Sequence, residues 1–153
     1  MPDILHRVGA QAPADAVYQA LATSEGIAAW WSKGTTGDND LGATITSAFT
    51  HPDTGEQLGT ISYTLEELVP DKRVGWRVTD GVPEWEGTLI RFDLEQVDGY
   101  TIVNFGHEGW AEASEFMGHC STKWATFLMS LKSYAETGVG QPSPADVQIS
   151  NWH

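Results

Sequence analysis

The sequence of 153 residues contains a single cysteine, Cys120, and only eight lysine and arginine residues. A lone cysteine cannot form an intrachain disulfide or a thiolate metal site. The eight basic residues are set against 21 aspartate and glutamate residues, so the formal net charge is −13. A surface this acidic repels phosphate backbones and anionic lipid headgroups. We therefore expect no nucleic-acid partner and no membrane-surface partner.

Long apolar runs are also absent from the sequence. None approaches the roughly 20 apolar residues that a membrane-spanning helix needs. Residues 1–7 have neither the charged start nor the apolar stretch of a secretory signal peptide. The simplest expectation is a cytoplasmic protein without a membrane partner.

Residue patterns that hold metals or activate nucleophiles are missing as well. The fragment Asp38–Gly42 starts like a calcium-binding loop, but Phe49 stands at the twelfth position, where such a loop places glutamate. No Gly-X-Ser-X-Gly elbow occurs, and Cys120 lies among apolar neighbours, where a thiol is usually inert. No two of the five histidines share a helix turn or a strand face: His6, His51, His107, His119 and His153. We therefore expect no metal ion, no cofactor and no catalytic residue of these kinds.

Apolar and aromatic residues, in contrast, are plentiful. Hydrophobic residues make up 41% of the chain, and there are seven tryptophans, five phenylalanines and four tyrosines. Each buried ring removes roughly 150–250 Å² from water, so this supply can build a core, a cavity wall or both. The length fits one domain. We place it at residues 1–140, followed by a tail at 141–153 that contains Pro142 and Pro144.

The order of secondary structure follows from hydrophobic periodicity. Alternation predicts a first strand over residues 4–10, and helical spacing predicts two short helices, one starting at Pro13 and one over 25–31 capped by Ser24. Residues 34–40 have the composition of a loop. Renewed alternation predicts five strands, at residues 44–49, 60–69, 73–79, 87–94 and 100–107. The period then changes and predicts a long helix over residues 113–137 that Gly138 can end.

This order, β-α-α-β(5)-α, predicts an α+β helix-grip fold, in which a curved antiparallel sheet closes over the long C-terminal helix. That helix is the only sizeable cover for the apolar face of the sheet. A sheet curled around one helix can leave a cavity. We predict a cavity of about 300–1,000 Å³ between Trp124 and the strand of Phe105. The residues expected to line it as ligand-binding residues are Trp31, Trp76, Phe92, Val103, Phe105, His107, Met117, Trp124 and Leu128.

His107 is the one candidate for chemistry inside this cavity. It follows Val103 and Phe105 at intervals of two, so the three side chains share a strand face. If that face is concave, the imidazole could orient a ligand or act as a general acid or base. The alternative is a histidine that caps a loop or faces water at the end of its strand.

Several segments resemble a known family in their residues, order and spacing. They are residues 12–21 (APADAVYQAL), the pair Trp30-Trp31, and residues 87–94 (GTLIRFDL), 101–109 (TIVNFGHEG) and 123–132 (KWATFLMSLK). Over residues 4–138 the chain resembles the START-like (SRPBCC) superfamily, which also holds the birch-pollen-allergen fold and the polyketide cyclases. Within it the chain is most similar to the activator of heat-shock protein 90 ATPase homologue-like family. The resemblance implies a helix-grip fold with a cavity and no assigned reaction.

The expected function is therefore the binding of a small apolar molecule, either a lipid or a polyketide-like compound. Two alternatives remain open at this point. One is a cyclase- or hydratase-like enzyme in which His107 moves a proton within the same cavity. The other is a chaperone-associated interaction module. A homodimer is a further possible assembly.

Overall fold

The computed structural model describes all 153 residues and begins with a strand and two short helices. These elements are β1 (Ile4–Ala10), α1 (Ala14–Ala22) and α2 (Ser24–Trp30). The predicted cap of the second helix is wrong by one residue. Thr23, in an extended conformation between the two helices, is the N-cap, and its Oγ1 accepts a hydrogen bond from the Gly26 backbone N–H at 3.0 Å. Gly26 must be glycine because a Cβ there would lie 2.3 Å from the Gln19 carbonyl oxygen.

Six strands follow, one more than predicted. They are β2 (Gly34–Gly37), β3 (Thr44–Thr50), β4 (Gln57–Val69), β5 (Arg73–Asp80), β6 (Leu89–Val97) and β7 (Tyr100–Glu108), with a single-turn 3-10 helix, η1 (Pro83–Trp85), before β6. The additional strand is β2, which the glycine-rich composition of residues 34–40 disguises as a loop. Antiparallel pairing with β3 holds these residues in a strand conformation, and the buried Thr35 hydroxyl forms a hydrogen bond with Ser47 Oγ at 2.8 Å.

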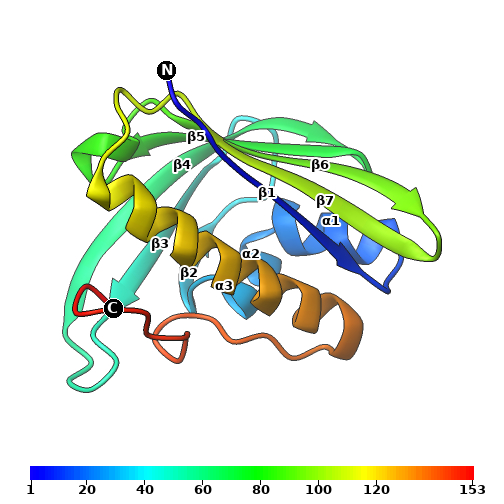
Figure 1. Cartoon of the computed structure of the whole chain (residues 1–153). Coiled ribbons are helices and arrows are strands. Elements are labelled where there is room, and N and C mark those ends of the chain that lie inside the picture. The colour runs from blue at the N-terminus through cyan, green and yellow to red at the C-terminus, as the bar shows by residue number, and fades with distance from the viewer.

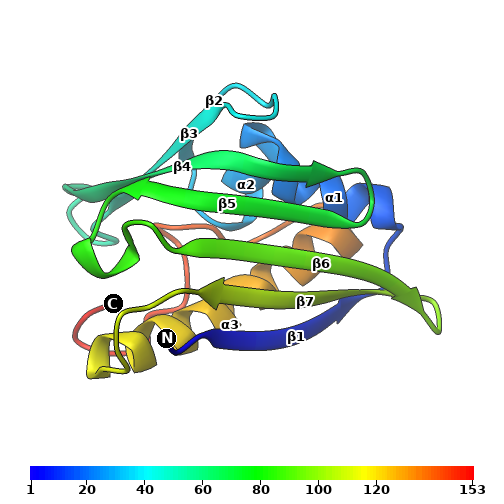
Figure 2. The ribbon, with the colours of Figure 1, turned by 90° about the horizontal axis from the view of Figure 1, so that it is seen from above.

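The seven strands form one antiparallel sheet in the order β1-β7-β6-β5-β4-β3-β2. Figure 2 shows β1 returning to the edge beside β7, where Ile4 pairs with His107. Two register shifts in β4, near Ser62 and Leu65, accompany the curl of the sheet. On its outer side Arg73 pairs with Glu67 and Asp93, and Arg91 with Asp93 and Glu108.

The long helix α3 (Glu115–Thr137) crosses the concave side of the sheet, as Figure 1 shows. Ser114 begins it by accepting a hydrogen bond from the Met117 N–H at 3.2 Å, so the helix starts two residues later than expected. Gly138 ends it with φ at 83°, a left-handed conformation suited to glycine. The α+β helix-grip prediction is confirmed.

The core has a closed end, which lies where α1 and α2 pack beside the second half of α3. Trp30, Trp76 and Phe92 are fully buried there, together with Leu128 and Leu131. Both indoles are anchored, because Trp30 Nε1 donates to the Ala20 carbonyl oxygen at 2.8 Å and Trp76 Nε1 donates to that of Leu21 at 3.0 Å. This end is a close-packed interior.

The last residues run back along α3 and meet the turn after α2 (Figure 1). The Ser143 N–H donates to the Trp31 carbonyl oxygen at 2.8 Å, and the Lys33 N–H donates to that of Ser143 at 3.1 Å. Residues 141–153, hereafter the tail, thus lie against the same chain. None of the helices has both the length and the apolarity needed to cross a bilayer.

Candidate functional site: an aromatic cavity beneath the tail

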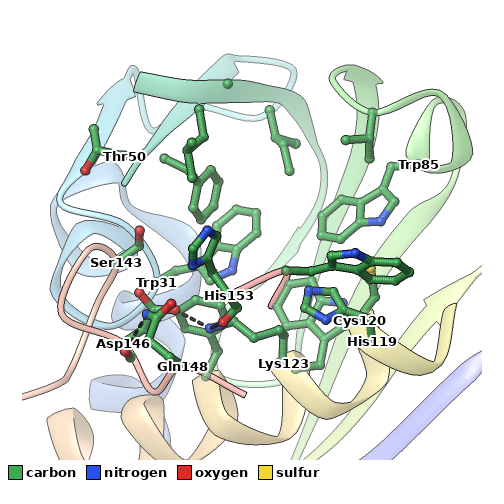
Figure 3. A pocket seen from close by; sticks show the side chains of 18 of the residues that line it. Trp31, Thr50, Trp85, His119, Cys120, Lys123, Ser143, Asp146, Gln148 and His153 are labelled. Atoms are coloured by element: carbon green, nitrogen blue, oxygen red, sulfur yellow. Dashed lines mark hydrogen bonds and ion pairs between the residues drawn. The ribbon is translucent and has the colours of Figure 1, made fainter. Parts of the chain in front are cut away.

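A cavity of about 290 Å³ lies at the end of the core opposite α1. Its walls come from five parts of the chain: the end of α2, the β3–β4 hairpin, the segment around η1, the first half of α3 and the tail, as seen in Figure 3. Most of the lining is aromatic or aliphatic, and the polar groups gather where the tail meets α3. Its volume is slightly below the lower limit expected from the sequence.

Three tryptophans form one wall of this cavity. Trp31 follows α2, Trp85 ends η1 and Trp124 lies in α3. Their planes are nearly parallel: 3° between Trp31 and Trp85, 15° between Trp31 and Trp124, and 17° between Trp85 and Trp124. The ring centroids lie 5.4–6.4 Å apart. Such a wall offers broad π-surfaces to an apolar or aromatic ligand.

His107 stands behind this wall, completely buried. The Trp124 indole N–H donates to its Nδ1 at 3.1 Å, so the ring proton is assigned to Nε2, which lies 2.8 Å from Thr88 Oγ1. The Thr88 hydroxyl in turn donates to the Trp85 carbonyl oxygen at 2.5 Å. Burial lowers the pKa of His107 to about 3. A neutral imidazole with both nitrogens engaged orients Trp124 and is poorly suited to moving a proton.

Of the nine predicted ligand-binding residues, the structure places two in the cavity lining, Trp31 and Trp124. The other seven pack behind the wall or deeper in the core: Trp76, Phe92, Val103, Phe105, His107, Met117 and Leu128. The position predicted for the cavity therefore needs correction. The rings of Phe105 and Trp124 are 4.7 Å apart and fill the space between them, and the cavity lies on the other side of Trp124. Large aromatic side chains thus fill the space between α3 and β7 where the sequence predicted a cavity.

Several lining residues were not recognised from the sequence. Trp85 follows Pro83 and Glu84 in a turn. A large aromatic residue in such a turn was the one sequence feature that could have indicated a place in the lining. On α3, Phe116, Lys123 and Phe127 also line the cavity, and they share a helix face with Trp124. The tail did carry a signal in the sequence, the apolar residues Val147, Ile149 and Trp152 spaced by two and three, but its place over the cavity depends on where the chain folds back.

Cys120 belongs to the apolar wall. It is 5% exposed, and burial raises the pKa of its thiol to about 12. The thiol therefore stays protonated at neutral pH and is a poor nucleophile. The Trp85 indole N–H, which lies beside this sulfur, makes no hydrogen bond to oxygen or nitrogen.

The polar rim of the cavity centres on Lys123. Its ammonium contacts the Asp146 carboxylate and donates to the carbonyl oxygens of Val147 at 2.7 Å and His153 at 3.0 Å. Figure 3 marks contacts of this ammonium with the tail by dashed lines. The pKa of the nearby His119 is lowered by burial and by the charges of Lys123 and His153. No group of three or more histidine, cysteine, aspartate or glutamate side chains is arranged to hold a metal ion.

Comparisons with known proteins identify the family. Residues 11–136 match the family model described as Activator of Hsp90 ATPase homolog 1-like protein. The chain belongs to this family. The resemblance seen in the sequence is thereby confirmed. Among curated proteins, none matches the chain.

Solved structures agree with this assignment. The solution structure of the Aha1 dimer from Colwellia psychrerythraea is 40% identical, with a TM-score of 0.77, and the match covers 92% of this chain and 100% of that one. A crystal structure from Staphylococcus saprophyticus is 19% identical, with a TM-score of 0.70 and coverage of 91% and 95%. CalU16 from Micromonospora echinospora is 17% identical, with a TM-score of 0.71 and coverage of 97% and 74%. The last two show a shared fold.

Proposed function

We propose that this protein binds a small apolar molecule in the cavity walled by Trp31, Trp85 and Trp124. The observation that carries the proposal is the contrast between this aromatic hollow and the filled core beside it. Ligand sites are concave, mostly apolar and supplied with a few polar groups, and this cavity has all three properties. A lipid or a polyketide-like compound has the required apolar body. The cyclase-like alternative loses support because its proton carrier, His107, is held neutral by burial.

The test is a titration with a small neutral aromatic probe, 2-naphthamide, followed by calorimetry. A probe of this size is expected to bind with a Kd of about 1 mM or below if it is well enclosed. Val82 lines the cavity just before η1, so the variant Val82→Trp should fill the space and abolish the binding heat. The matched control is Val69→Trp at the exposed last residue of β4, which should bind like the wild type. Equal binding by both variants would refute the proposed site.

We also propose that the chain forms a homodimer, because the Colwellia relative at 40% identity is a dimer. Light scattering coupled to size exclusion measures the mass in solution directly. A mass near twice 16.7 kDa is the expected result. A mass of one chain at all concentrations tested would contradict it.

A further inference from the structure

Lys123 is a cation in an unusual position. It projects from α3 at the rim of the cavity with its side chain only 14% exposed, and its ammonium lies 5.0 Å from the centre of the Phe127 ring. In a chain with a net charge of −13, a shielded cation beside an apolar hollow requires a negative partner.

All the polar partners of this ammonium come from the tail. They are the Asp146 carboxylate and the carbonyl oxygens of Val147 and His153, which together use its three N–H donors. Neither the sheet nor α3 supplies an acid to it. The cation is therefore fixed to a helix, whereas its counter-charge is on a segment without regular secondary structure.

Apart from ring contacts of His153 with His51 and of Trp152 with His119, the attachment of residues 144–153 depends on this one side chain. Every hydrogen bond between that stretch and the rest of the protein outside the tail is donated by Lys123. Its remaining hydrogen bonds stay within the tail, such as Ala145 N–H to the Pro142 carbonyl oxygen. Trp152 is 46% exposed and Val147 is 47% exposed, so apolar burial adds little. Release of this stretch would therefore break no hydrogen bond between core elements.

The same stretch presents to the cavity the two groups of an amphipathic acid, an aromatic ring and a carboxylate. Trp152 contributes an aromatic ring to the lining, where it meets His119 at 5.5 Å, and Asp146 contributes a carboxylate to Lys123. The Trp152 ring thus occupies part of the cavity lining, and the Asp146 carboxylate occupies the Lys123 ammonium.

We propose that the ligand is an amphipathic carboxylic acid with a flat apolar body, that its carboxylate binds Lys123, and that residues 144–153 are an internal substitute which the ligand displaces. The inference rests on the proposed function, because it takes the cavity as the ligand site. Displacement exchanges one charge-assisted contact for another, so the cation is never left unpaired. The ligand's ring would in addition contact the three-tryptophan wall, whereas the ring of Trp152 packs against His119.

The experiment compares two probes with the same ring, 2-naphthoate and 2-naphthamide, at pH 7 and about 0.15 M salt, where charges beyond about 8 Å are largely screened. Asp146→Asn removes the internal carboxylate while keeping its shape. We expect it to tighten naphthoate binding about tenfold and to change naphthamide binding by less than about twofold, since hydrogen bonds to charged groups are the strong ones. Lys123→Gln should abolish the preference for the acid, and Lys123→Arg should restore it.

Two control variants test whether any change in the ratio of the two affinities is specific to Asp146 and Lys123. Asp93→Asn removes another ion-paired acid, which lies on the outer side of the sheet, and Lys132→Gln removes another ion-paired lysine of α3. Neither should alter the ratio of the two affinities. In wild-type protein, naphthoate but not naphthamide should sharpen the indole NMR signal of Trp152 as the tail is released.

The outcomes separate the two proposals. If naphthamide binds but the acid preference is the same in wild type, Asp146→Asn and Lys123→Gln, the assignment of an acid is overturned while the cavity remains the ligand site. If neither probe binds any variant, both proposals are overturned.

Discussion

The two ends of the space between the sheet and α3 use the same amino acid differently. At the closed end Trp30 and Trp76 donate their indole N–H groups to carbonyl oxygens at the end of α1. At the cavity end Trp85 has no oxygen or nitrogen acceptor, and the cover is a hairpin, one turn of 3-10 helix and the tail. The two packed helices at the closed end fill the space and supply carbonyl acceptors to the indoles. The loops at the cavity end leave space unfilled and supply no acceptor to Trp85. A tryptophan is therefore core at one end and cavity wall at the other.

The same difference is seen between two consecutive residues, Trp30 and Trp31. Trp30 is the last residue of α2, and its ring lies in the closed end against Trp76 and Phe92. Trp31, one residue later, turns its ring to the cavity wall. The end of the helix separates their directions and so marks the boundary between the two regions.

The largest expected effect is on the closed end. Trp76→Ala should lower the free energy of unfolding by about 4 kcal/mol, since it empties a filled interior. Trp85→Ala should cost roughly half as much, because one side of that ring already borders a cavity. Urea unfolding followed by circular dichroism measures both values. Equal losses would show that the two ends are packed alike.

The next effect concerns the imidazole between the two regions. Burial holds the pKa of His107 at about 3, against an ordinary value of 6.5, so the folded protein binds fewer protons than the unfolded chain between these values. This contribution to stability is complete above pH 6.5 and is lost as the pH falls toward 3. We expect His107 to account for roughly 2 kcal/mol of lost stability between pH 7 and pH 5.

The control for this pH dependence is His107→Gln, which keeps a polar side chain but cannot titrate. The variant should be less stable at pH 7 and lose correspondingly less between pH 7 and pH 5. If wild type and variant fall in parallel over that interval, the imidazole is not held neutral by its burial.

A smaller loss should follow from Thr88→Val. The change removes the hydroxyl that joins His107 to the Trp85 carbonyl oxygen and leaves Nε2–H unpaired, at a cost of about 1–2 kcal/mol. Thr101→Val is the matched change, since Thr101 is equally buried but bonds only the Ala12 carbonyl oxygen. Thermal unfolding should rank Thr88→Val as the more damaging. The reverse order would contradict the chain of hydrogen bonds behind the wall.

The smallest effect is expected for the tail. Trp152→Ala should change the free energy of unfolding by less than about 0.5 kcal/mol, because the side chain is 46% exposed. Chemical denaturation provides the value. A loss comparable to that of Trp76→Ala would mean that the tail belongs to the core and cannot act as a movable cover.

The fold was predictable from the sequence because it depends on local patterns. Alternation marked β3 to β7, and three- and four-residue spacing marked α3. The short strand β2 was missed because Gly34 and Gly37 resemble turn residues, and only β3 makes them a strand.

The site was less predictable, because a cavity is what packing leaves over. The list of apolar residues on facing elements included Trp31 and Trp124, but it could not show that Phe105 and Trp124 would interlock. Nor could it place Trp85 in the cavity lining or Lys123 beside the tail. Those positions depend on side-chain volumes and on how β4, η1 and residues 141–153 come together around one cavity.

The most direct test of the central claim is a proton–nitrogen NMR titration of the tryptophan indole groups with 2-naphthamide. Each indole N–H gives its own signal, so the location of the ligand is read together with its binding. The account predicts saturable shifts for Trp31, Trp85 and Trp124, which line the cavity, and none for Trp30 and Trp76, which are hydrogen-bonded in the closed end. Shifts confined to Trp30 and Trp76, or no shifts at all, would contradict a ligand site at this cavity.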